Sequence, residues 1–323
     1  MNALTGLPAG NPGIKKLRAF FNESVRCWQL YLFCLIPLIY LLIFCYYPML
    51  GLQIAFKNYS FTKGIWGSEW IGFKHITTFF NSHQFWRVVT NTLRISLYSM
   101  AVNFPLPIIF ALFLNVLRNQ KLKKFVQTVT YIPHFISVTV LVGIMLRIFG
   151  SVTGLYGTFY RMLGFDGYAP DLFASAGTFN HMYVWSGAWQ NMGFNSIIYI
   201  AALTSVDPGL HEAAEIDGAS RLARIFHVDL PAILPTASIM LVLRFGQMMN
   251  VGFEKVYLMQ KDINLSQSEI ISTYIYKVGL NSSTSFSYGT AIGLFNSIIN
   301  CALLVIVNMI ARRMNNEGGG SLW

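Results

Sequence analysis

Long apolar stretches separated by short polar segments dominate this chain. Between Arg26 and Lys57 the sequence contains no Asp, Glu, Lys or Arg, and five further stretches are nearly as apolar. Each is long enough to cross about 30 Å of hydrocarbon as a helix. The pattern therefore predicts six membrane-spanning helices, at about residues 28–50, 95–117, 125–149, 181–206, 233–253 and 288–311.

The length of these stretches indicates the fold class. Strands of a β-barrel would be shorter and would alternate in hydrophobicity, so a barrel is excluded. Prolines at positions 37, 105, 107 and 133 fall inside the predicted spans. Membrane helices tolerate them where neighbouring helices satisfy the freed backbone groups. We expect an all-α polytopic membrane protein with six transmembrane helices.

Composition supports a membrane protein. Of the 323 residues, 54% are hydrophobic and 11% are charged, whereas about 25% are charged in soluble domains. This excludes a water-soluble globule and a disordered chain. The net charge of +10 comes from short basic clusters between apolar runs. That distribution is typical of cytoplasmic loops and does not suggest nucleic-acid binding.

The basic residues also predict an orientation. With the N-terminus in the cytoplasm, short inner segments hold twelve of the 23 basic residues: Lys15, Lys16, Arg18, Arg26, Arg118, Lys121, Lys123, Lys124, Arg221, Arg224, Arg312 and Arg313. We expect a cytoplasmic N-terminal segment (1–27), a six-helix membrane domain (28–311) with one long inner loop (207–232), and a cytoplasmic tail (312–323). The first 27 residues lack the apolar core of a cleavable signal.

Metal and disulfide chemistry is not indicated. The four cysteines form no CxxC motif and lie in or beside apolar runs, and the six histidines form no HExxH motif. We therefore assign no metal-ligating and no catalytic residue. The cysteines are best explained as small apolar residues in helices.

Polar residues inside the predicted spans are candidates for a polar pathway. Arg244, Gln247 and Asn250 recur at a spacing that would place them near one face of the fifth helix. The other candidates are Trp189, Asn191 and Asn195 in the fourth span and Asn296 and Asn300 in the sixth. Such hydrogen-bonding groups and aromatic faces suit a polar solute. Alternatively, the Asn residues join helices to one another. A lone cation inside a span is costly, so we expect Arg244 to neutralise an acidic solute or to pair with a carboxylate of a partner subunit.

The inner loop 207–232 has the features of a helical hairpin. Asp207 can cap a helix that has Pro208 in its first position. The helix should end near Asp217, Gly218 permits a turn, and a second short helix should stop before Pro231. Small apolar residues on one side of the first helix could press into a groove of another protein. The alternative is an ordinary solvated connector.

Three segments of this loop resemble a family motif. They are Glu212-Ala213-Ala214, Asp217-Gly218-Ala219 and Val228-Asp229-Leu230-Pro231. Their spacing resembles the EAA loop in permease subunits of ABC importers. Tyr131-Ile132-Pro133-His134-Phe135-Ile136-Ser137 and Gly289-Thr290-Ala291-Ile292-Gly293-Leu294-Phe295 are similar to the subgroup that imports polysaccharide fragments, alginate oligosaccharides among them. The resemblance covers nearly the whole chain.

The resemblance implies a type I importer permease of the bacterial cytoplasmic membrane, with both termini in the cytoplasm. It implies that the loop couples the permease to an ATPase through Glu212, Ala213, Ala214, Asp217, Gly218, Ala219, Leu230 and Pro231. The implied partners are a second, related permease, two ATPase subunits, an extracytoplasmic binding protein, membrane lipid and an oligosaccharide that could be acidic. This chain has no Gly-Lys dipeptide and so no phosphate-binding loop. ATP and Mg would bind on the partner ATPases, and this chain would hold no cofactor.

Two other classes of protein remain as alternatives. A membrane enzyme acting on lipid-linked sugars would need oriented carboxylates or a histidine cluster, and the sequence orients neither Asp166 nor Asp171. A structural scaffold would need neither an intramembrane Arg244 nor a coupling loop.

Overall fold

The computed structural model describes residues 28–281 and 285–314, which form parts of two compact units, Met1–Ile54 and Ala55–Trp323. We describe each unit by itself. The basic residues predicted for the N-terminal segment and the glycine-rich end of the tail lie outside the described residues.

The first unit is an apolar helix. It runs through α2 (Trp28–Leu41), a π-helical segment (Leu42–Tyr46) and α3 (Tyr47–Met49) into a 3-10 segment, Leu50–Phe56. None of the α2 residues is buried. A helix that is apolar on all sides suits a lipid environment. The helical first span predicted for residues 28–50 is confirmed.

The second unit begins with small elements. Strands β1 (Lys57–Asn58) and β2 (Glu69–Trp70) pair antiparallel, with Lys57 opposite Trp70, and α4 (Gly64–Gly67) lies between them. Helix α5 (Lys74–Phe80) follows. Helices α6 (Gln84–Asn103) and α7 (Pro105–Val116) then meet at Phe104. The predicted second span therefore begins earlier than residue 95.

The third predicted span is not one straight helix. Helix α8 (Gln120–Tyr131) passes through a 3-10 turn (Ile132–Phe135) to α9 (Val138–Ile148), with a bend of 102°. Pro133 has no N–H to continue the α8 ladder. The side chain of Ser137 starts the new helix by accepting a hydrogen bond from the Val140 N–H. The prediction of a continuous span over 125–149 was wrong for these reasons.

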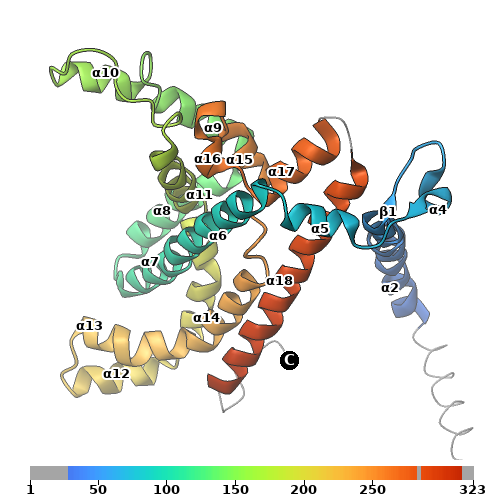
Figure 1. Ribbon diagram of the computed structural model, residues 1–323. Coiled ribbons are helices and arrows are strands. Elements are labelled where there is room, and N and C mark those ends of the chain that lie inside the picture. Colours follow the sequence, from blue (N-terminus) through green and yellow to red (C-terminus); the bar gives the residue numbers. More distant parts are fainter. Residues whose placement is uncertain (1–27, 282–284, 315–323) are drawn as a thin grey trace, which may run out of the picture. The chain divides into compact units, whose positions relative to one another are not determined.

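The central helix of the second unit is α11 (Ala176–Thr204), which packs against α6, α7, α8 and α14 (Figure 1). Its approach to α8 is very close. A Cβ atom added at Gly193 would lie 2.3 Å from the carbonyl oxygen of Thr130. Helix α10 (Leu155–Met162) lies between α9 and α11 in the chain.

The remaining helices follow in chain order: α12 (Pro208–Ile216), α13 (Arg221–Arg224), α14 (Leu230–Phe245), α15 (Phe253–Met259), α16 (Leu265–Ser268), α17 (Ile271–Tyr276) and α18 (Phe286–Met314). A 3-10 turn (Asp262–Asn264) precedes α16, and a π-helical segment (Lys277–Asn281) follows α17. Figure 1 shows α12 and α13 at one end of this unit, and α9, α15 and α16 towards the other.

Three apolar clusters hold the second unit together. One joins α7, α11 and α14, a second joins α5, α6, α17 and α18, and a third joins α6, α9, α11 and α15. Glu269, only 2% exposed, adds an ionic contact because it pairs with Arg87 on α6 and with Lys277. The segment after α15 is thereby fixed to α6.

Four helical stretches of the described residues are long and apolar enough to cross a membrane, and the bent pair α8–α9 would make a fifth. The fourth predicted span corresponds to α11, whose 29 residues include several Asn, Ser and Gln. It is long enough to span, but it is not among the apolar helices. The mostly helical fold is as predicted, whereas the number of six spans stays a prediction.

Candidate functional site

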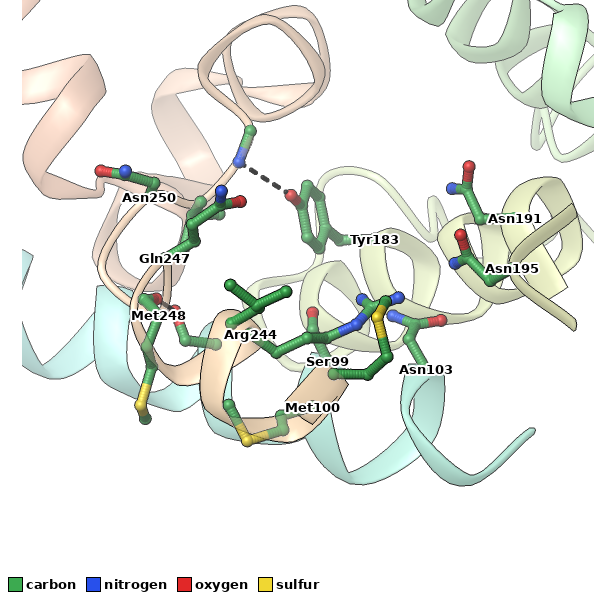
Figure 2. A pocket seen from close by; sticks show the side chains of 15 residues that line it. Ser99, Met100, Asn103, Tyr183, Asn191, Asn195, Arg244, Gln247, Met248 and Asn250 are labelled. Carbon is green, nitrogen blue, oxygen red and sulfur yellow. Dashed lines mark hydrogen bonds between the residues drawn. The ribbon is translucent and has the colours of Figure 1, made fainter. Parts of the chain in front are cut away.

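A polar cavity of about 540 Å³ lies between α6, α11, α14 and the turn after α14. This volume is in the range of ligand sites. The cavity contains five of the predicted pathway residues: Asn191, Asn195, Arg244, Gln247 and Asn250. Figure 2 shows Arg244 extending from α14 towards the side of the cavity where Ser99 and Asn103 lie.

Arg244 is a half-buried cation in the last turn of α14. Among the described residues it has no ion-pair partner. The negative end of the helix dipole stabilises a cation at this position by about 0.3–1 kcal/mol. That is less than the cost of desolvating an unpaired charge. The guanidinium is therefore available to an anion in the cavity.

The prediction that Arg244, Gln247 and Asn250 lie near one face of a helix was wrong. Helix α14 ends at Phe245, and the chain then makes turns in which Gln247 N–H bonds to the Arg244 carbonyl and Asn250 N–H to the Gln247 carbonyl. The three side chains share no helical face. The turn still brings all three to the same cavity.

Asn296 and Asn300 of α18 hold this turn in place. Both donate to the side-chain oxygen of Asn250, over 3.1 and 3.0 Å, and Asn300 accepts from the Met249 N–H. Neither is among the residues that line the cavity. Trp189 also lies elsewhere, with 53% of its surface exposed. In the cavity, Asn191 is oriented by a 2.9 Å contact with His134 of the 3-10 turn.

The sequence-based prediction missed Ser99, Asn103 and Tyr183, which also line the cavity. Ser99 Oγ and Asn103 Oδ1 are buried and have no hydrogen-bond partner among the residues that the structure describes. Such atoms are costly unless a ligand or water satisfies them. Their spacing of four residues in an apolar helix was a signal available in the sequence.

The helical hairpin predicted for the inner loop 207–232 begins as expected. The side chain of Asp207 accepts from Gly209 N–H over 2.9 Å, with Pro208 in the first helical position of α12. The helix ends at Ile216, and Gly218, two residues further on, has a φ of +74°. Gly218 N–H bonds to the Glu215 carbonyl and Ala219 N–H to the Ala214 carbonyl. This is a Schellman motif, in which glycine is the favoured residue.

The second half of the hairpin differs from the prediction. Helix α13 does not stop before Pro231. It continues through a π-helical turn (Ile225–Asp229) into α14, where Leu230 and Pro231 occupy the first positions. Pro231 therefore lies inside a continuous helix, where its missing N–H removes one bond of the ladder. The π-helical turn lies directly before this position, as expected where the regular α-helical ladder is interrupted.

Beneath α12, a cavity of about 440 Å³ is bordered by α7, α11, α12 and α13. Asp229, with a side chain only 2% exposed, lies at its wall. Its carboxylate accepts from Asn115 over 3.1 Å and lies 3.3 Å from His211 Nε2 on α12. A second contact, between Arg224 and Glu215, spans 3.1 Å. These polar contacts connect α12 with α7 and with the start of α14.

The hairpin carries exposed large apolar residues. Its large residues are Leu210, Ile216, Leu222 and Phe226, and Ile216 is 86% exposed. Glu212, Ala213, Asp217 and Gly218 are exposed too, while Ala214 and Ala219 are half-buried.

Residues 103–316 match the family described as "Binding-protein-dependent transport system inner membrane component". Protein LplB of Bacillus subtilis (strain 168) is 40% identical over 289 residues, which cover 90% of each chain. The polygalacturonan/rhamnogalacturonan transport system permease protein YteP of the same organism is 39% identical over 304 residues, covering 94% of each chain.

Two solved structures of bacterial alginate transporters are similar to this chain. A chain of a bacterial ABC transporter "involved in the import of the acidic polysaccharide alginate" is 36% identical, with a TM-score of 0.84 over 92% of this chain and 99% of that chain. A bacterial alginate ABC transporter in complex with a periplasmic protein bound to alginate pentasaccharide gives a TM-score of 0.83 at 36% identity. The homologues are transport permeases and not enzymes. The chain belongs to the binding-protein-dependent transport inner membrane components, and it is a multi-pass permease subunit of a sugar ABC importer.

Proposed function

We propose that this permease carries acidic oligosaccharides through the cavity around Arg244. The observation that carries the proposal is an unpaired guanidinium in a polar cavity, beside the unpartnered atoms of Ser99 and Asn103. A carboxylate would pair with the cation, and sugar hydroxyls would bond to the neutral polar groups. Gln247, Asn195, Asn191 and Asn250 supply further amides to the same space.

The proposed link to ATP hydrolysis is the helical hairpin. Helix α12 would dock through Ile216 and its exposed apolar neighbours onto an ATPase subunit, with Glu212 and Asp217 at the rim. Movement of α12 would reach α14 through the contact of His211 with Asp229, and α7 through Asn115. Because Arg244 lies at the far end of α14, the same helix borders both sites.

The proposed assembly follows from one hairpin per permease chain. A second, related permease would provide the second hairpin, and two ATPase subunits would bind ATP and Mg. An extracytoplasmic binding protein would deliver the oligosaccharide, as in the solved alginate transporter that contains a periplasmic protein. Both termini of this chain would lie in the cytoplasm, on the same side as α12.

Docking of α12 can be tested with two matched exposed isoleucines. Ile216→Asp places a charge on the proposed docking face, whereas Ile263→Asp changes a residue that is 75% exposed and lies in the 3-10 turn before α16. In the complex purified from the membrane, Ile216→Asp should lower the amount of bound ATPase and the ATP-driven uptake of oligosaccharide at least fivefold, while Ile263→Asp leaves both near wild type. Equal retention of the ATPase in both variants would contradict the docking.

A further inference from the structure

A second cation faces the transport cavity. Lys255 on α15 is only 8% exposed, and it lines a further lobe of about 390 Å³. That lobe adjoins the Arg244 cavity, because the two share Ser99, Asn103, Tyr183, Asn191 and Gly252. Arg244 and Lys255 thus line two adjoining polar cavities from two different helices.

No carboxylate of the described residues neutralises Lys255. Its ammonium donates to the carbonyl oxygen of Tyr183 over 2.9 Å and lies 4.7 Å from the centre of the Tyr183 ring. The adjacent Glu254 points to another partner, since it accepts from Thr139 of α9 over 3.0 Å. Burial lowers the pKa of Lys255 to about 8.

The packing keeps this ammonium accessible from the lobe. A Cβ atom at position 187 would lie 3.4 Å from Lys255 Nζ, but the residue there is glycine. An ammonium has three donors, of which one is used by the Tyr183 carbonyl. Glu254 also lines the lobe, but its carboxylate accepts a hydrogen bond from Thr139 and forms no ion pair with Lys255 among the described residues. Since a buried charge is costly unless it is paired, Lys255 favours an anionic group of an occupant.

We propose that Lys255 is a specificity-determining residue that binds a carboxylate of the transported oligosaccharide, in the lobe next to the Arg244 cavity. The proposal rests on the proposed function, because it names a second charge contact for the same substrate class. With a cation in each of the two cavities, the pathway would select oligosaccharides that carry more than one acidic sugar. A purely structural Lys255 would instead tie α15 to α11 without regard to substrate charge.

The test compares two forms of one sugar. The reconstituted complex, with its binding protein, is supplied with a uronic acid trisaccharide or with the same trisaccharide after its carboxyl groups are reduced to alcohols. Lys255→Gln should lower uptake of the acidic form about tenfold relative to the reduced form, the expected loss for a charge-assisted hydrogen bond. Lys255→Arg should keep the preference. Lys74→Gln, which removes the same charge from an exposed position of α5, should not change it.

The ratio of the two substrates within one variant does not depend on how much of that variant folds. An unchanged ratio in Lys255→Gln would overturn the role of Lys255, and if uptake of both forms falls by the same factor, Lys255 positions α15 without reading substrate charge. Failure of the proposed function looks different, because the wild-type complex would then import neither form or would prefer the reduced one.

Discussion

His211 on α12 lies 3.3 Å from the buried carboxylate of Asp229, which leads directly into α14. This contact joins the exposed helix α12 to the helix whose last turn holds Arg244. Asp229 also accepts a hydrogen bond from Asn115 of α7, so its carboxylate has one partner on α12 and another on α7. Hydrogen bonds to a buried charge stabilise by about 1.5–3 kcal/mol.

Replacing Asp229 should therefore uncouple the two sites. Asp229→Ala leaves Asn115 and His211 without their acceptor, and we expect uptake per ATP hydrolysed to fall about five- to tenfold while ATP hydrolysis persists. Glu215→Gln serves as the control, because it removes an exposed ion pair with Arg224 that contributes about 0–1 kcal/mol. Measuring uptake and hydrolysis on the same vesicles checks this. Equal effects of the two substitutions would count against the contact.

Gly218 offers a test of the hairpin turn. At a φ of +74°, a side chain is strained by about 1–2 kcal/mol even though nothing lies within 4 Å of its Cβ position. Gly218→Ala should therefore reduce coupled uptake severalfold, and Gly218→Asn should reduce it less because Asn tolerates this conformation. Insertion into the membrane should be unaffected in both. If Ala is tolerated as well as Asn, backbone conformation is not what requires glycine here.

Gly193 tests the close packing of α11 on α8. Its Cβ position lies 2.3 Å from the Thr130 carbonyl oxygen, so Gly193→Ala would push the helices apart and destabilise the protein by about 1–3 kcal/mol. Gly143→Ala on α9 meets nothing within 4 Å and should be neutral or slightly stabilising. Thermal unfolding of the detergent-purified complex compares them. Equal melting temperatures would show that the helices adjust without cost.

Substrate preference should depend on pH through Lys255. Because burial lowers the pKa of this lysine to about 8, the ammonium is charged below pH 8 and becomes neutral as the pH rises to 9. The other ionisable groups lining the two lobes are Tyr183, Glu254 and Arg244. We expect the preference for acidic over reduced trisaccharide, measured as kcat/KM of uptake, to decline from pH 7 to pH 9.

Lys255→Gln provides the control for this profile, because it removes the titrating group. Its preference should be low and constant between pH 7 and pH 9. A wild-type preference that stays constant over this range, or a Lys255→Gln profile that declines in parallel with it, would assign the pH dependence to another group.

The helical hairpin and the apolar helices could be predicted from sequence because their signals are local. Asp207, Pro208 and Gly218 each act on the backbone within a few residues, and the cap, first turn and C-terminus of α12 formed where expected. The π-helical turn before Pro231 and the 102° bend between Phe135 and Val138 depend on how the chain accommodates a nearby proline in its packed context. Their geometry could not be derived from proline positions alone.

The cavity could be predicted only in part. Arg244 stood out because a cation in an apolar run is costly, and its neighbours Gln247 and Asn250 reached the cavity through a turn instead of a helical face. Asn296 and Asn300 were predicted to line the pathway because they are polar residues in an apolar span, but their side-chain amides donate to Asn250. Lys255 and Tyr183 become neighbours only when α15 packs near α11, a contact between distant parts of the chain.

The most direct test of the account compares substrate-stimulated with basal ATP hydrolysis in the reconstituted complex carrying Arg244→Ala. If Arg244 binds substrate in the cavity and α14 connects it with α12, stimulation by the loaded binding protein should fall about tenfold, while basal hydrolysis stays near wild type. A loss of both activities in the same proportion would instead make Arg244 a structural residue, and it would contradict the proposed path from cavity to ATPase.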